Sequence, residues 1–178
     1  MALNLLKDEI VKPNSVDTLH KQIEAIKIAF SDTLHYVTDP QFMEMNPDYL
    51  LSQDYVKLRK KDLTDKALLH SPIDYASSGT VYLATADKDG NMVSFIQSNY
   101  MGFGSGVVID GTGISMQNRG HTFKLDSTHH NKLHPRKKTY HTIIPGFILK
   151  DNKAIGPFGV MGGFMQPQGH LQVVVNLI

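Results

Sequence analysis

Two stretches of alternating residues flank an Asp-Gly turn, and this pattern constrains the fold more than any other feature. The first stretch runs from Thr80 to Ala86 and the second from Met92 to Ser98, with Asp-Lys-Asp-Gly-Asn between them. Asp-Gly between alternating runs is typical of a β-hairpin. With the turn centred on Asp89, the register predicts Thr80 opposite Ser98. Two hydroxyl side chains are therefore expected side by side at the open end of the hairpin.

The residues just before this hairpin indicate where the chain could be cut. Ser77, Ser78 and Gly79 form a small, flexible approach to Thr80. Cleavage between Gly79 and Thr80 would leave a threonine with a free amine, so that a hydroxyl nucleophile carries its own base. An ordinary hairpin with two edge hydroxyls explains the same pattern, and periodicity alone favours that simpler explanation.

The remainder of the chain predicts helices first and strands later. Residues 16–30 have apolar side chains at helical spacing, and Asn14 or Ser15 can cap the helix. A second, shorter helix follows Ser52, and its basic run at 59–61 is interpreted as a solvated face. Residues 71–79 are expected to form an exposed loop. The strand candidates are residues 107–109, 113–116, 142–149 and 154–160, with a turn at 151–153 joining the last two.

Length and composition exclude several classes of protein. A chain of 178 residues is long enough for one domain with a core, and a net charge of +1 does not indicate binding to nucleic acid or a membrane surface. There is no cysteine, so disulfides and a cysteine nucleophile are excluded. No apolar stretch is long enough to span a bilayer, and no secretory apolar region follows Met1. The compartment stays open, with a preference for the cytoplasm.

Several stretches together resemble the gamma-glutamyltransferase family. They include Thr80–Val93 (TVYLATADKDGNMV), Gly102–Gly113 (GFGSGVVIDGTG) and Met161–Gly163, which resemble the start of the small subunit. The stretches 97–106, 140–145 and 158–171 resemble a bacterial branch of that family often described as gamma-glutamyltransferase-like or cephalosporin-acylase-like. Residues 2–6, 20–30 and 39–40 resemble the last part of the large subunit. The resemblance covers nearly the whole chain.

The resemblance implies an α+β fold, in which the chain forms part of the four-layer αββα sandwich of N-terminal-nucleophile hydrolases. Residues 1–79 would be the mainly helical end of a large-subunit-like region. Residues 80–178 would be a mainly β small-subunit-like region, and the two together would form one structural domain. Residues 170–178 fit a helix or a strand, and the resemblance favours a helix. The rest of the large and small subunits would be partners of this chain.

The resemblance also implies the catalytic residues. Thr80 matches the family's nucleophile, released by cleavage of the Gly79–Thr80 bond, and Ser98 matches a hydroxyl that hydrogen-bonds to it. Gly162 and Gly163 match the paired glycines whose N–H groups form the oxyanion hole. A plain strand serine at 98 and a simple turn or bulge at 162–163 are the alternatives.

The expected substrate contacts depart from the common family pattern. Tyr100 stands where that pattern has an asparagine. Arg119 and Thr122 stand where it has acidic or amide residues. His141 and Thr142 stand where it has two serines. An acidic clamp for a substrate ammonium group is therefore missing. Arg119 suits an acyl group that ends in a carboxylate. A solvated loop arginine is an equally good interpretation of the sequence.

No metal or cofactor is predicted. His129, His130 and His134 fit no recognised zinc spacing, and basic side chains surround them. Residues 102–106 are glycine-rich, but no Gly-Lys-Ser or Gly-Lys-Thr follows. They are therefore expected to form a tight turn near the active site, not a phosphate loop.

The predicted function is that of a self-processing N-terminal-threonine amidohydrolase or acyltransferase. It would cleave gamma-glutamyl or similar amide bonds through an acyl-enzyme. One alternative is an acylase for carboxylate-ended side chains of the glutaryl-amide or cephalosporin type. Another is a catalytically inactive fragment that acts only as a subunit.

Overall fold

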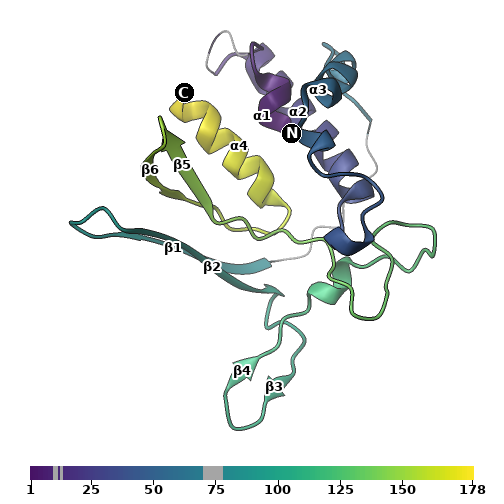
Figure 1. Cartoon of the computed structure of the whole chain (residues 1–178), viewed down its shortest axis with the longest axis vertical. Helices are drawn as coiled ribbons and strands as arrows, with labels where there is room; N and C mark the ends of the chain where they lie inside the picture. The colour runs from purple at the N-terminus through teal and green to yellow at the C-terminus, as the bar shows by residue number, and fades with distance from the viewer. Residues whose placement is uncertain (10–11, 13, 70–77) are drawn as a thin grey trace. The chain divides into compact units, whose positions relative to one another are not determined.

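The structure is a computed structural model and describes residues 1–9, 12, 14–69 and 78–178 (Figure 1). The chain divides into two compact units. Unit 1 consists of Met1–Ile73, Thr122–Tyr140 and Leu171–Ile178, and unit 2 consists of Asp74–His121 and His141–His170. Of the loop predicted at 71–79, residues 71–77 lie outside the described part. Its last two residues are strand instead, because β1 begins at Ser78.

Unit 1 is mainly helical. Ser15 caps the predicted first long helix, since its Oγ accepts a hydrogen bond from Thr18 N at 3.2 Å. Ser52 caps the next helix through Tyr55 N at 3.1 Å. The helices are α1 (Ala2–Leu6), α2 (Val16–Tyr36) and α3 (Gln53–Arg59). Short 3₁₀ turns lie at η1 (Pro40–Phe42), η2 (Tyr49–Leu51) and η3 (Lys60–Asp62).

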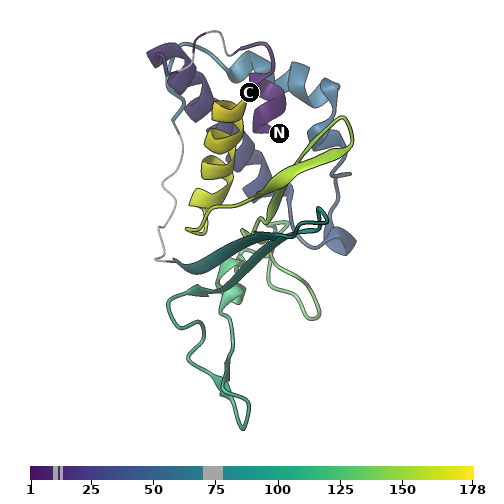
Figure 2. The same ribbon diagram turned by 90° about the vertical axis from the view of Figure 1, so that its left-hand side faces the viewer.

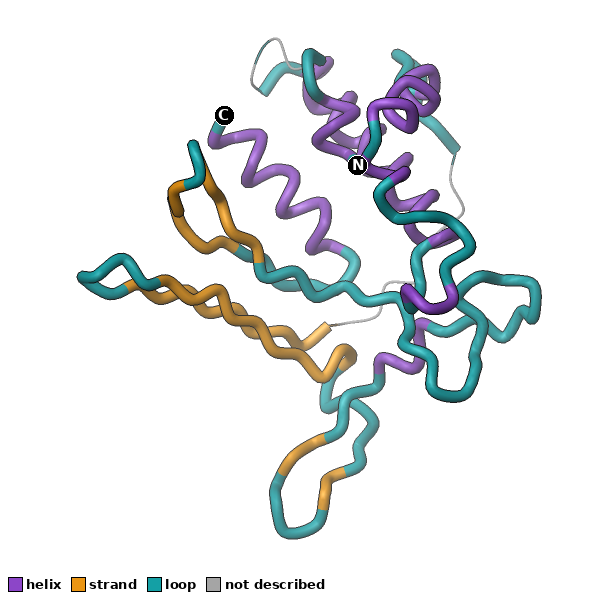
Figure 3. Tube along the Cα trace, in the orientation of Figure 1, coloured by secondary structure: helices purple, strands orange, loops and turns teal. Residues whose placement is uncertain are grey.

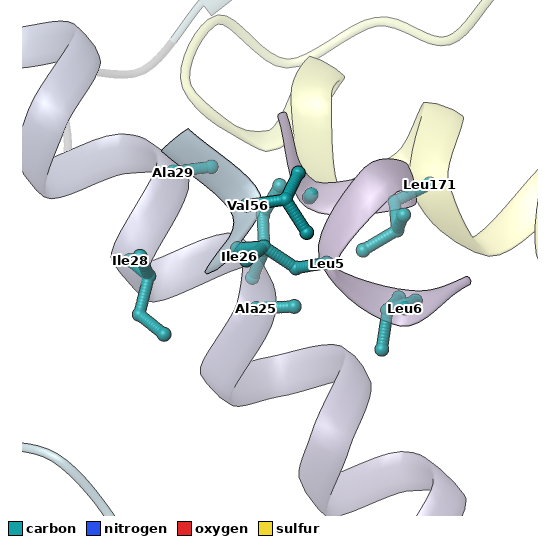
Figure 4. Packing of buried hydrophobic residues seen from close by; sticks show 9 residues of the cluster. Leu5, Leu6, Ala25, Ile26, Ile28, Ala29, Val56 and Leu171 are labelled. Carbon is teal, nitrogen blue, oxygen red and sulfur yellow. The ribbon is translucent and has the colours of Figure 1, made fainter. Parts of the chain in front are cut away.

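The apolar core of unit 1 joins these helices to the last turns of α4 (Met165–Leu177). Figure 4 shows side chains of α1, α2, α3 and α4 meeting in this cluster. Burying a leucine or isoleucine side chain in such a core contributes about 1.5–3 kcal/mol. The cluster consists of Ala2, Leu5, Leu6, Ala25, Ile26, Ile28, Ala29, Val56 and Leu171.

The segment Thr122–Tyr140 is held to the rest of unit 1 by polar contacts. Thr38 Oγ1 donates to Asn131 Oδ1 at 2.9 Å, and Lys138 N donates to Asp39 Oδ2 at 2.8 Å. The backbone N–H donors of Lys138 and Gln41 lower the pKa of Asp39. This segment carries the histidines considered above, and no cluster of three or more potential ligands for a metal ion occurs among the described residues.

Unit 2 is built from antiparallel hairpins. In the described residues they are β1 (Ser78–Ala86) with β2 (Met92–Met101), β3 (Val108–Ile109) with β4 (Ile114–Ser115), and β5 (Gly146–Lys150) with β6 (Lys153–Phe158). The prediction of a strand from residue 142 was wrong for residues 142–145, which form a loop (Figure 3). Pro145 has no N–H to pair, and the Ile144 amide bonds to a side chain instead of a strand.

The β5–β6 hairpin lies beside the β1–β2 hairpin in both views (Figures 1 and 2). Ser94 Oγ on β2 donates to the carbonyl of Gly146 at 2.9 Å, which ties the two hairpins together. The predicted C-terminal helix is confirmed as α4, although it begins at Met165, earlier than residue 170. No helix in the described ranges has the length and apolar character required to cross a membrane.

Candidate active site

The predicted pairing of two hydroxyls at the open end of the first hairpin is confirmed. Thr80 is the register partner of Ser98 across β1 and β2. Thr80 Oγ1 donates a hydrogen bond to Ser98 Oγ at 3.0 Å, and Thr80 is only 9% exposed. The alternation of the strands places both side chains on one face, so the register alone brings them together.

Ser98 also contacts the peptide bond that precedes Thr80. Its Oγ donates to the carbonyl oxygen of Gly79 at 3.1 Å and accepts the N–H of Tyr100 at 2.9 Å. A serine hydroxyl has one hydrogen to donate and can accept two hydrogen bonds. Ser98 therefore uses its full capacity on Thr80, Gly79 and Tyr100, which fixes the direction of each bond.

Tyr100 turns the chain at the end of this hairpin. It has a left-handed backbone with φ of +78° and is buried. Such a backbone is costly for a residue with a bulky side chain, so the surroundings must hold it. Burial raises the pKa of its phenol, although the charge of Arg119 opposes this shift.

Arg119 lies over Tyr100 and contacts Thr142. Its guanidinium carbon is 5.1 Å from the Tyr100 ring centre, and its Nη1 donates to Thr142 Oγ1 at 3.2 Å. Arg119 is 5% exposed and Thr142 is 1% exposed, so the interpretation of Arg119 as a solvated loop arginine is wrong. Burial lowers the pKa of Arg119, but a guanidinium remains charged at neutral pH.

His141 lies beside this cluster but is exposed. Its Nδ1 accepts the N–H of Ile143 at 3.1 Å, so the neutral ring carries its proton on Nε2. Partial desolvation and the positive charge of Arg119 lower the pKa of His141. The ring is therefore neutral at pH 7. Thr122 belongs to unit 1, where its hydroxyl donates to the carbonyl of Tyr140 at 3.1 Å.

Gly162 and Gly163 form a turn immediately before α4. Their φ values are +115° and +58°, a backbone region that favours glycine. Within the described residues, the N–H groups of these glycines donate to no protein acceptor. Gly162 is exposed and Gly163 is buried, and two adjacent N–H groups of this kind are suited to binding an oxyanion.

A close contact connects the strand of Thr80 with the segment that leads to this turn. A Cβ at Gly159 would lie 2.5 Å from ring atoms of Tyr82. Tyr82 lies on the same face of β1 as Thr80, since the two are separated by one residue. Glycine at 159 therefore permits the backbone before the Gly162–Gly163 turn to approach the face that carries Thr80. The sequence reasoning missed Gly159, because its role depends on the packing of Tyr82.

The sequence reasoning also missed the buried polar residues of α4. Gln166 is fully buried and its Oε1 accepts the N–H of Ile144 at 3.0 Å, while His170 Nδ1 donates to the carbonyl of Gln166 at 2.7 Å. A signal was present in the sequence, because glutamine and histidine four residues apart share one face of a helix. It shows the common face but not that this face is buried.

The combination of hairpins and helices is an α+β fold, as predicted. Comparison with solved structures identifies the fold family. A crystal structure of cephalosporin acylase from Bacillus halodurans is similar over 98% of this chain and 32% of that chain, at 61% identity and a TM-score of 0.89. The fold is thus that of the N-terminal-nucleophile hydrolases, of which this chain holds a part. The family model for gamma-glutamyltranspeptidase matches residues 1–178, and the chain belongs to that family.

The curated relatives carry the names of hydrolases. The glutathione hydrolase-like YwrD proenzyme of Bacillus subtilis is 37% identical over 100% of this chain and 34% of its own length. The oxamate amidohydrolase proenzyme of Klebsiella pneumoniae is 35% identical over 87% of this chain and 29% of its own length. The acylase ACY 1 proenzyme of a Pseudomonas species is 29% identical over 92% of this chain and 30% of its own length. The chain spans about a third of the length of these relatives.

The contact between Gly159 and Tyr82 gives a prediction about stability. Gly159→Ala places a methyl group against the Tyr82 ring and is expected to destabilise the protein by about 1–3 kcal/mol, the usual range for overpacking. Gly156→Ala on β6 is the matched control, because a Cβ there meets no atom of the described residues within 4 Å. Thermal melts of the two variants measure the difference. Equal melting temperatures would contradict the close approach of the two segments.

Proposed function

We propose that the full-length protein containing these residues is a self-processing amidohydrolase or acyltransferase with Thr80 as its nucleophile. The observation that carries the proposal is the bonding of Thr80 Oγ1, Ser98 Oγ and the Gly79 carbonyl in one chain of hydrogen bonds. The family membership and the hydrolase names of the relatives support the reaction class. Several of those relatives are named proenzymes, which supports processing.

The contacts support a processing step at the Gly79–Thr80 bond. Thr80 Oγ1 attacks the carbonyl carbon of Gly79, whose oxygen is polarised by the hydroxyl of Ser98. The C–N bond to Thr80 then breaks, and its nitrogen takes the proton from the threonine hydroxyl. The product is an ester between Gly79 and Thr80 Oγ1. Water hydrolyses this ester to the carboxylate of Gly79 and leaves Thr80 with a free hydroxyl and a free amine.

In turnover, the same hydroxyl attacks the carbonyl of an amide substrate. The free amine of Thr80 accepts the hydroxyl proton and passes it to the leaving amine, and an acyl ester on Oγ1 results. Water or another amine then takes the acyl group. The N–H groups of Gly162 and Gly163 stabilise the oxyanion in both steps. Removing one such donor typically costs about 100- to 1000-fold in kcat.

The buried arginine supports an acyl group that ends in a carboxylate. Tyr100 and Thr142 hold the guanidinium of Arg119, and Tyr100 is connected to Ser98 through its N–H. A fixed, planar guanidinium binds a carboxylate through paired hydrogen bonds and repels an ammonium group. We therefore propose glutaryl-amide or cephalosporin-type acyl groups ahead of gamma-glutamyl groups with a free α-amine. The similarity to a cephalosporin acylase supports this choice.

We also propose that the remaining segments of the large and small subunits cover the exposed face of the first hairpin. Register and alternation place Val81, Leu83, Val93 and Phe95 on one face, and each is about half exposed. A continuous apolar face of this kind is a usual site for contact with further protein. The chain covers about a third of the length of its relatives, and this agrees with the proposal that further segments cover the apolar face.

The processing mechanism gives a prediction for the full-length protein. We expect the wild-type protein to yield a fragment that begins at Thr80. Thr80→Ala should not be cleaved, and Thr80→Ser should be cleaved in part. Ser98→Ala should be cleaved more slowly, because this variant loses the donor to the Gly79 carbonyl. Intact-protein mass spectrometry over time measures each product. Thr85→Ala, which changes a threonine on the opposite face of β1, is the control and should process normally. Normal cleavage in Thr80→Ala would contradict the mechanism.

A second prediction concerns acyl specificity. Arg119→Gln should lower kcat/KM for a glutaryl amide by about 10- to 100-fold, the typical value of a hydrogen bond to a charged group. Its kcat/KM for a gamma-glutamyl amide should fall less or rise, because the repulsion of the substrate ammonium is removed. Arg136→Gln, at an exposed arginine in unit 1, is the control. An unchanged ratio of the two specificity constants would place Arg119 outside the acyl pocket.

A further inference from the structure

We infer that Gln166 is a positioning residue that holds the Gly162–Gly163 turn in register with the segment carrying Thr142. The inference rests on the proposed function, since it joins the proposed oxyanion donors to the proposed carboxylate contacts. Gln166 lies in the first turn of α4 and is 0% exposed. Its position between the two segments, and not its burial alone, carries the inference.

Gln166 makes one bond to each of the two segments. Its backbone N–H donates to the carbonyl of Gly163 at 3.0 Å, and its side-chain Oε1 accepts the N–H of Ile144 at 3.0 Å. Ile144 is two residues from Thr142 and lies before β5, so its amide has no place in a strand ladder. The carboxamide of Gln166 provides the acceptor that a neighbouring strand would otherwise provide.

These two bonds complete a continuous path through unit 2. The path starts at the proposed nucleophile and ends at the glycine turn, and each step is a hydrogen bond, a ring contact or a short stretch of backbone. Its residues, in order, are Thr80, Ser98, Tyr100, Arg119, Thr142, Ile144, Gln166 and Gly163. A shift of the glycine turn relative to residues 142–144 therefore requires the Gln166 contact to break or to move.

The chemistry of the side chain argues against a packing role alone. The bond from Ile144 N–H requires the oxygen of the carboxamide at that place, so the orientation of the amide is fixed. Its Nε2 is then buried with no hydrogen-bond partner among the described residues. Such a group is costly, and an apolar side chain of similar size would fill the same space without that cost. Only a polar side chain at position 166 provides an acceptor for the N–H of Ile144.

His170 offers a matched comparison one turn further along α4. It is also buried, and its Nε2 also has no partner in the described part of the chain. Among the described residues, its Nδ1 bonds only to the carbonyl of Gln166 within the same helix, and its ring packs on Phe158 at 5.0 Å between ring centres. Replacing His170 therefore removes a buried polar side chain without removing the acceptor of the Ile144 amide.

The test compares Gln166→Met, Gln166→Glu and His170→Met in the full-length, processed protein with a glutaryl amide as substrate. Gln166→Met has no acceptor for the Ile144 amide and should lose about 10- to 100-fold in kcat, because displacements of about 1 Å at a site can cost that much. KM should change less than threefold, since Arg119 keeps its contacts. Gln166→Glu keeps an oxygen at this place and should recover most of the kcat. His170→Met should keep a kcat within about twofold of the wild type.

The outcomes separate this inference from the proposed function. Wild-type kcat in Gln166→Met, beside an inactive Thr80→Ala, would overturn the positioning role alone. Equal losses of kcat in Gln166→Met and His170→Met, in proportion to their losses of melting temperature, would also overturn it. If the wild-type protein showed no turnover, or if its turnover did not require Thr80, both the proposed function and this inference would be overturned.

Discussion

The hydrogen bond between Thr80 and Ser98 is the interaction on which the rest of the site depends. It exists because the Asp-Gly turn fixes the register of β1 and β2, and a shift of one residue would place the two hydroxyls on opposite faces. Ser98 then connects outward, to the Gly79 carbonyl and to the Tyr100 amide. The turn of the hairpin, at its far end, thereby determines the chemistry at its open end.

Two further constraints arrange unit 2 around that pair. Tyr100 adopts a left-handed backbone that places its ring under Arg119, and Arg119 in turn contacts Thr142. Glycine at 159 allows the segment before α4 to approach Tyr82 on the nucleophile's face. The candidate site is therefore composed of segments far apart in the sequence, and each is held by a contact that a single substitution can remove.

The hairpin register and the helix caps could be predicted because they depend on local patterns. Asp-Gly and strict alternation define the hairpin, and serine before an amphipathic run defines the starts of α2 and α3. The burial of Arg119 could not be predicted, because a charged side chain usually lies at the surface, and its contacts with the Tyr100 ring and the Thr142 hydroxyl join residues that are far apart in the sequence. The strand predicted at 142–145 failed for a related reason. The Ile144 amide is satisfied by a side chain from α4, more than 20 residues away, and no local pattern indicates that bond.

The most direct test of the account is to find where the acyl group resides during turnover. The processed full-length protein is mixed with a glutaryl amide, quenched in acid within one turnover, and mapped by peptide mass spectrometry. If Thr80 is the nucleophile, the peptide that begins at Thr80 carries the added mass of one acyl group. The added mass is then absent when Thr80 is replaced by alanine. An acyl group on any other residue, or rapid turnover without a covalent acyl group on Thr80, would contradict the account.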